Sequence, residues 1–136
     1  MRILGLDLGE RRVGVALSDE LGLIAQPLTT FEPTGDRALV SAVCKLVSER
    51  EVNRIVVGLP LNQDGSYGPR AKRVEALSAV LAKESGLPVI PVDERFTSRQ
   101  ASRAIAEAPA KVRRDKAVLD RIAAAIILQA YLDSQH

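Results

Sequence analysis

Apolar positions at the start of the chain recur with a period of two, which predicts three consecutive strands. Residues 2–8 alternate so that three leucines share one face and Asp7 lies on the other. A second strand is expected over residues 13–17, joined to the first by a hairpin turn. A third is expected over residues 23–30, where Pro27 indicates a sheet edge because proline cannot donate a backbone hydrogen bond.

The period then changes to that of amphipathic helices alternating with short, fully apolar strands, which is typical of buried parallel strands. This order predicts an α/β fold, a five-stranded mixed sheet of three antiparallel and then two parallel strands flanked by helices. We expect one domain over residues 1–136. The predicted helices cover residues 36–49, 69–84, 97–107 and 115–132, the two further strands cover 54–57 and 89–92, and residues 108–114 form a basic connection.

Charge is unevenly distributed along the chain, although the net charge is only +2. Eight of the 19 Lys and Arg residues lie between Arg95 and Arg121. Such a stretch suits a phosphate backbone, and the alternative is an ordinary solvated helical surface. The four Phe and Tyr residues are too few for a long base-stacking platform, so recognition of a duplex or junction by backbone and shape is favoured.

Several common chemistries are excluded by composition. Cys44 is the only cysteine, so no internal disulfide forms, and its apolar neighbours at helical spacing indicate a small core residue. The N-terminus lacks the pattern of a secretion signal and no apolar run could cross a bilayer, so we expect a cytoplasmic protein without membrane contact. The only histidine is His136 at the chain end, which leaves catalysis to carboxylates.

Two acids stand where ligands bind in α/β sheets. Asp7 lies inside the first strand between Gly5 and Gly9, which share its face and would leave room for a metal or phosphate. Alternatively, Asp7 only caps the turn at Gly9. Glu94 follows the fifth strand at its C-terminal end, the usual position of ligand sites, and the alternative is an ordinary acidic turn before a helix.

Asp120 lies at the border of the broad apolar face of the last helix, where a charge must be paired or bind a metal. The alternative is an ion pair with Arg121 or Lys116. Three converging carboxylates would repel one another unless a cation lay among them. Oxygen ligands favour Mg²⁺ or Mn²⁺, and two such ions can hold the attacking water and the leaving oxygen of a phosphodiester.

Four stretches of the chain, in this order, carry a resemblance to a known family. The chain resembles the YqgF/RuvX family, relatives of the RuvC junction resolvases in the RNase H-like superfamily. The resemblance implies a nuclease with Asp7, Glu94 and Asp120 as catalytic, metal-binding carboxylates. The matching stretches are residues 5–19 (GLDLGERRVGVALSD), 57–62 (VGLPLN) with Asp64-Gly65, 93–98 (DERFTS) and 119–129 (LDRIAAAIILQ).

The resemblance also implies a substrate and its contacts. It implies 5′-end maturation of the precursor of 16S ribosomal RNA, or, in an older interpretation, resolution of Holliday junctions, for which a homodimer would be expected. It further implies that substrate phosphates are contacted by Arg11, Asn62, Arg70, Arg95 and Arg99. RuvC-like resolvases cluster four carboxylates, whereas this chain offers three.

Two further functions remain open at this level. One is a non-catalytic nucleic-acid-binding factor of ribosome assembly. The other is an actin-like or sugar-kinase ATPase, which shares the Asp-x-Gly hairpin but needs a second domain to close on its nucleotide.

Overall fold

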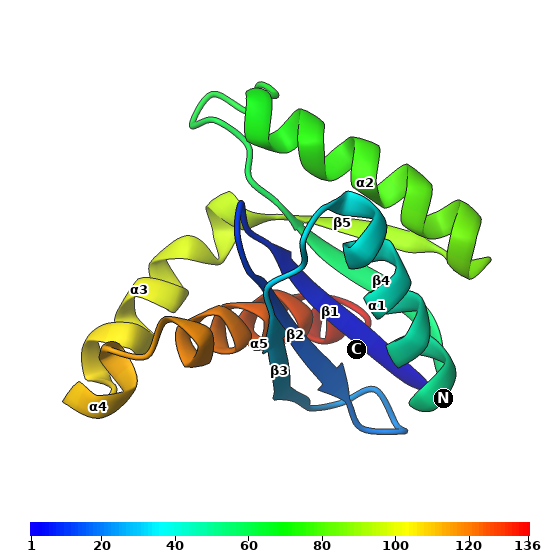
Figure 1. Cartoon of the computed structure of the whole chain (residues 1–136). Helices are drawn as coiled ribbons and strands as arrows, with labels where there is room; N and C mark the ends of the chain where they lie inside the picture. Colours follow the sequence, from blue (N-terminus) through cyan, green and yellow to red (C-terminus); the bar gives the residue numbers. More distant parts are fainter.

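A five-stranded mixed sheet forms the centre of the molecule, as predicted (Figure 1). The computed structural model describes the backbone of residues 1–136 and all side chains except those of Phe96 and Ser98. The strand order is β3-β2-β1-β4-β5, with β1, β2 and β3 antiparallel and with β4 and β5 parallel to β1. The strands are β1 (Arg2–Leu8), β2 (Val13–Ser18), β3 (Ala25–Phe31), β4 (Val52–Leu59) and β5 (Val89–Asp93).

Helices cover both faces of the sheet (Figure 1). Two pack on one face, one long helix packs on the other, and a short helical arm projects from the sheet between β5 and that long helix. The elements are α1 (Asp36–Glu49) and α2 (Pro69–Ser85) on the first face, α5 (Lys116–Ser134) on the second, and η1 (Glu94–Phe96), α3 (Ser98–Glu107) and α4 (Ala110–Arg113) before α5.

The alternation of β1 divides the core into two layers. The leucines of β1 pack with α1 and α2, whereas Ile3 packs on the α5 face with Val56 and Leu128. Asp7 follows Ile3 at a spacing of four residues and therefore belongs to the α5 face. In β4, both faces are buried, which explains its continuous apolar run.

Gly5 serves the packing of α5, which corrects our expectation that it leaves room for a ligand. A Cβ at Gly5 would lie 2.7 Å from Leu128 Cβ, so the glycine lets α5 approach the sheet closely. At Gly9 a Cβ would lie 2.7 Å from the carbonyl oxygen of Arg12, inside the β1–β2 turn. Neither glycine opens the space beside Asp7 that we expected.

Several boundaries and contacts differ from the prediction. Strand β3 begins only at Ala25, because Asp19 accepts hydrogen bonds from the backbone amides of residues 23 and 24 and keeps them in the turn. The basic connection contains the short helix α4. Helix α3 begins at Ser98, one residue after the predicted start, and the hydroxyl of Thr97 donates to the carbonyl oxygen of Glu94. Cys44 is half-buried at the edge of the core.

The ends of α5 lie within two residues of the predicted bounds. Asp115 caps α5 by accepting hydrogen bonds from the amides of Ala117 and Val118.

Among the described residues, no helix is long and apolar enough to cross a membrane.

Candidate active site and nucleic-acid interface

The three predicted carboxylates lie at the C-terminal ends of the parallel strands, on the face covered by α5. Asp7 is near the end of β1 and pairs with Gly14 of β2. Glu94 follows β5 in η1, and Asp120 lies in the second turn of α5. Residues more than 100 positions apart in the sequence are thus gathered at one end of the sheet.

Asp7 occupies the middle of this group. Burial and, to a smaller extent, the negative charge of Asp120 raise its pKa to about 6, although Arg70 opposes both effects. A carboxylate near the end of a strand in this environment is costly to ionise without a neighbouring cation.

Glu94 lies on the other side of Asp7. Burial and the charge of Asp7 together raise its pKa to about 7, while Arg70 again opposes them. Its neighbour Asp93 points away and forms an ion pair with Arg95, which lowers the pKa of Asp93. Only Glu94 of this acidic pair therefore belongs to the group, as strand geometry requires.

Asp120 has a partner that we did not anticipate. Its Oδ2 lies 2.5 Å from Nε of Arg12, which comes from the β1–β2 turn. Arg121, one of the two partners expected from sequence, instead donates to the hydroxyl of Thr30 on β3. The ion pair therefore links α5 to the turn next to Asp7 rather than to its own helix.

Two glycines allow the acids to come together. A Cβ at Gly14 would lie 2.0 Å from the backbone carbonyl oxygen of Asp120, so only glycine lets α5 lie this close to β2. A Cβ at Gly58 would lie 2.3 Å from Oε1 of Glu94. Both positions fall in the motifs of the sequence, but we assigned no role to either glycine.

The carboxylates fit a divalent cation in chemistry but not as a closed cage. All three offer oxygen ligands, the type that Mg²⁺ and Mn²⁺ prefer, and the raised pKa values of Asp7 and Glu94 reflect their burial and the negative charge of the neighbouring acids. As the described residues are placed, no group of three acids, cysteines or histidines is close enough to hold an ion together. The carboxylate of Asp120 is instead paired with Arg12.

A groove of about 390 Å³ opens beside Asp120. Its walls are the β1–β2 turn from Gly9 to Arg12 and the side chain of Arg70, which begins α2. Arg70 is exposed, yet close enough to lower the pKa of both Asp7 and Glu94. Of the predicted phosphate contacts, Arg70 is thus the one placed directly beside the acids.

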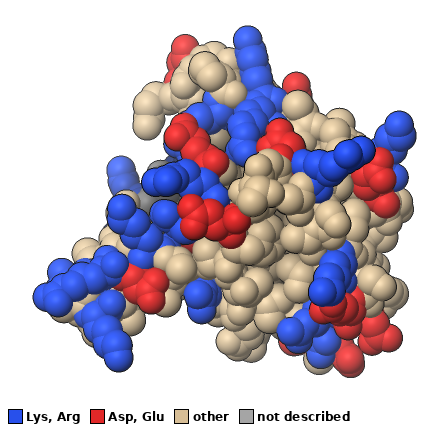
Figure 2. All heavy atoms as spheres, in the orientation of Figure 1, with Lys and Arg blue, Asp and Glu red and all other residues tan. Residues whose placement is uncertain are grey.

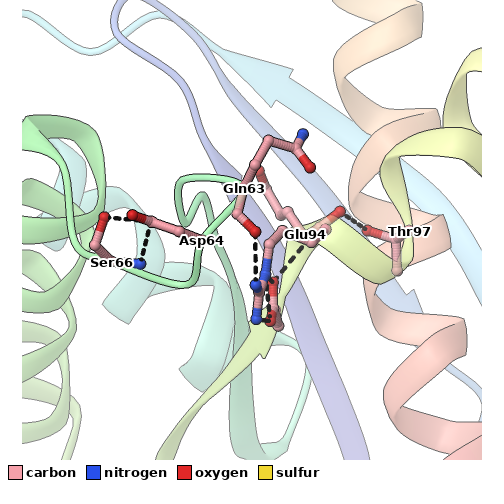
Figure 3. A network of polar contacts seen from close by, with 7 residues as sticks. Gln63, Asp64, Ser66, Glu94 and Thr97 are labelled. Carbon is pink, nitrogen blue, oxygen red and sulfur yellow. Dashed lines mark hydrogen bonds and ion pairs between the residues drawn. The ribbon is translucent and has the colours of Figure 1, made fainter.

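The predicted contacts Asn62 and Arg95 brace the loop between β4 and α2. Arg95 donates to both carboxylate oxygens of Asp93 and to the carbonyl oxygen of Gln63, and Asn62 donates to the hydroxyl of Ser66. Figure 3 shows the part of this network without the Asn62 contact, with Asp64 and Ser66 at one side and Glu94 with Thr97 at the other. The contacts of Arg95 hold the loop next to the end of β5.

The remaining two predicted contacts lie further out. Arg11 is exposed in the β1–β2 turn, 4.0 Å from Glu32, and lines the groove. Arg99 is exposed on α3, at the base of the projecting arm. Figure 2 shows Lys and Arg side chains gathered on that arm. Its exposed cations are Arg99, Arg103, Lys111, Arg113 and Arg114, and Lys116 follows at the start of α5.

Sequence reasoning missed two arginines. Arg12 pairs with Asp120, and Arg73 of α2 donates to the carbonyl oxygen of Gly9 and to Asp36. Arg12 lies inside the first motif, so its position was visible. Its partner was not, because 108 residues separate the two and only the folded sheet brings them together.

Comparison with known proteins identifies the family. The family model "RuvX: Holliday junction resolvase" matches residues 1–134. The chain belongs to the RuvX family. Membership of this family argues against the ATPase alternative.

Curated relatives of this RuvX chain match it over nearly its full length. A protein of Pelotomaculum thermopropionicum is 46% identical over 136 residues, covering 99% of this chain and 88% of its own length. One of Moorella thermoacetica is 48% identical over 133 residues, covering 98% and 95% respectively. Both carry the name "Putative pre-16S rRNA nuclease".

Solved structures share the fold. RuvC of T. thermophilus in complex with a Holliday junction substrate superposes with a TM-score of 0.64 at 18% identity, over 99% of this chain and 96% of RuvC. The fowlpox virus Holliday junction resolvase gives a TM-score of 0.59 at 13% identity and covers both chains fully. These likenesses confirm the RNase H-like fold of this RuvX chain.

Proposed function

We propose that this RuvX-family nuclease is a metal-dependent endonuclease that cuts structured RNA at the 5′ side of precursor 16S ribosomal RNA. The observation that carries the proposal is the gathering of Asp7, Glu94 and Asp120 at one end of the sheet. Asp7 interacts electrostatically with each of the other two acids, and Arg70 and Arg12 line the adjoining surface.

Asp7, Glu94 and Asp120 would hold the cation, Mg²⁺ or Mn²⁺. Such an ion, or a pair of them with substrate bound, supplies charge stabilisation and an activated water for phosphodiester hydrolysis. The chain itself orients the acids: the Gly14 and Gly58 contacts fix their approach, and Arg70 provides a positive charge beside them. The buried, poorly solvated position of Asp7 strengthens its attraction for a cation.

The basic arm and the groove support a nucleic-acid substrate. The exposed cations of α3 and α4 continue from the end of β5, next to Glu94, away from the body of the molecule (Figures 1 and 2). A phosphate backbone lying along the arm would lead toward the acids, with Arg11, Arg70 and Arg99 as contacts and Asn62 and Arg95 positioned by the loop network.

We favour RNA over a four-way DNA junction as the substrate because the relatives named for RNA are the more similar in sequence. The relatives at 46% and 48% identity carry the pre-16S ribosomal RNA name, whereas the junction-bound structure shares 18% identity. We therefore place ribosomal RNA processing first and treat junction resolution as the competing outcome of the test.

The test compares the two substrates in one assay. Purified protein is incubated with Mn²⁺ and either end-labelled precursor 16S RNA containing its 5′ leader or a four-way DNA junction. We expect cleavage of the RNA leader that disappears with EDTA and in Asp7→Asn. Asp133→Asn is the matched control, since it makes the same chemical change at an exposed acid near the far end of α5.

Each outcome decides between the alternatives. Cleavage of the junction but not the RNA would replace the substrate while leaving the active site in place. Tight RNA binding without cleavage of either substrate would indicate a non-catalytic assembly factor. Cleavage that survives in Asp7→Asn would remove the carboxylates from the mechanism.

A further inference from the structure

The ion pair between Arg12 and Asp120 places a fixed cation directly on one of the three acids. The Nε–Oδ2 distance is 2.5 Å, and 31% of the Arg12 side chain and 24% of the Asp120 side chain remain exposed. The pair is thus buried too little to prevent either side chain from exchanging its partner, and it is not a freely solvated surface contact. A guanidinium donating to a carboxylate is among the stronger hydrogen bonds in proteins.

The backbone around the pair is held rigidly. Gly14 pairs with Asp7 in the sheet, and its bare Cα lies against the carbonyl oxygen of Asp120. Arg12 is two residues before Gly14, in a turn closed by a hydrogen bond from the amide of Gly9 to its carbonyl oxygen. Because both backbones are fixed, a change of partner needs only side-chain rotation.

The pair also borders the groove in which a phosphate would lie. Arg12, Asp120, Arg11 and Arg70 all line it. The Arg12 guanidinium therefore has a second anionic partner within its reach when nucleic acid is bound, and Asp120 lies close enough to Asp7 for its charge to act on that acid.

We propose that Arg12 is a positioning residue that holds Asp120 away from the metal site until a substrate phosphate takes over the guanidinium. This inference rests on the proposed function. Before nucleic acid binds, Arg12 neutralises Asp120 and weakens cation binding. When a phosphate accepts the guanidinium, Asp120 turns toward Asp7 and Glu94, so the metal and the nucleic acid bind cooperatively.

This arrangement accounts for two observations together. The described acids do not form a ready three-ligand group, and the one engaged elsewhere, Asp120, is held by a groove-lining cation. Thermodynamic linkage requires the effect to be reciprocal: if nucleic acid strengthens metal binding, the metal strengthens nucleic-acid binding by the same factor.

The experiment measures Mn²⁺ binding by titration calorimetry, without and with a duplex that cannot be cleaved. In the unmodified protein we expect the duplex to tighten Mn²⁺ binding about tenfold, within the usual range of such coupling. In Arg12→Gln, Mn²⁺ should bind about tenfold more tightly without duplex, and most of the coupling should be lost. Arg12→Lys keeps the charge without the planar fork and should lie between the two.

Arg37→Gln is the matched control, since it removes the same charge from an exposed arginine of α1, on the other face of the sheet from α5. We expect it to change Mn²⁺ affinity less than twofold. In a protein that already carries Asp120→Asn, adding Arg12→Gln should no longer change the Mn²⁺ affinity. A general effect of Arg12→Gln on folding would persist in that background.

The result that overturns the inference is equal Mn²⁺ affinity in Arg12→Gln and Arg37→Gln, with coupling unchanged. This is distinct from failure of the proposed function, in which the unmodified protein would bind no Mn²⁺ that depends on Asp7. Thermal unfolding of each variant shows whether it is folded. If Arg12→Gln is unfolded, the Arg12→Lys titration decides, and unchanged affinity and coupling in that variant would overturn the inference.

Discussion

Asp7 shows how a single buried acid links stability to pH. Its pKa in the fold is about 6, against an ordinary value of 3.8, because burial and Asp120 disfavour the charged form. A raised pKa stabilises the folded state fully below the ordinary value, and this contribution is lost as the pH rises through the folded value. Glu94, with a pKa of about 7, changes stability in the same direction.

We therefore expect the metal-free protein to lose stability between about pH 4 and pH 7. Replacing Asp7 with Asn removes its ionisation, so Asp7→Asn should be more stable than the unmodified protein at about pH 8 in EDTA, by up to about 3 kcal/mol at 1.36 kcal/mol per pKa unit. The two should differ little at about pH 4. Thermal unfolding at both pH values measures this, and a variant that is less stable at high pH would contradict it.

At the same scale, the chemistry of the site was partly readable from sequence. The lack of a usable histidine directed attention to carboxylates, and Asp7, Glu94 and Asp120 do gather at one end of the sheet. The pairing of Arg12 with Asp120 was not readable, because local spacing suggested Arg121 or Lys116 instead. Long-range partners follow from the sheet order, which only the fold supplies.

At the scale of the elements, helix α5 both covers one face of the sheet and carries Asp120. Its approach depends on Gly5 against Leu128 and on Gly14 against Asp120. Sequence periodicity predicted α5 and the strands to within two residues, and α1 with its observed bounds, because a regular apolar pattern indicates which face is buried. Periodicity cannot tell whether a glycine makes room for a ligand or for a helix, because the sequence shows the same residue in both cases.

Gly14→Ala should separate α5 from β2. The added Cβ would lie 2.0 Å from a backbone oxygen, which cannot rotate away, so we expect a loss of about 3 kcal/mol in the free energy of unfolding. Gly35→Ala is the control, because no heavy atom lies within 4 Å of the Cβ built there. Urea unfolding of both variants tests this. A loss no larger in Gly14→Ala than in Gly35→Ala would mean that α5 shifts at little cost.

On the scale of the whole molecule, charge is separated from the apolar layers. The basic arm formed by α3 and α4 projects beyond the sheet (Figures 1 and 2), whereas Arg37 and Lys83 belong to α1 and α2, which cover the opposite face from α5. A binding surface on the arm should therefore respond to salt in a way that the far face does not.

We predict that neutralising three arm cations lowers the salt dependence of duplex binding. Each lost phosphate contact reduces the slope of log affinity against log salt by about 1, so the triple variant should lose about 3. Three substitutions on α1, α2 and the residue after α1 make the same charge change and should leave the slope unchanged. The arm set is Arg103, Lys111 and Arg114, and the control set is Arg37, Arg50 and Lys83, all to Gln.

Fluorescence anisotropy with a labelled duplex gives both slopes. Equal slopes for the two variants would mean that the substrate does not follow the arm.

The order of the elements, with α5 after all five strands, has a consequence for synthesis on the ribosome. Until α5 has emerged, residues such as Ala16 and Val56 have nothing to cover them. Asp120 arrives with the same helix that shields the sheet, so a chain made only as far as α4 has neither its second apolar layer nor its full set of acids. The ribosome therefore adds the last acid of the candidate site and the cover of the sheet together, after all five strands have been made.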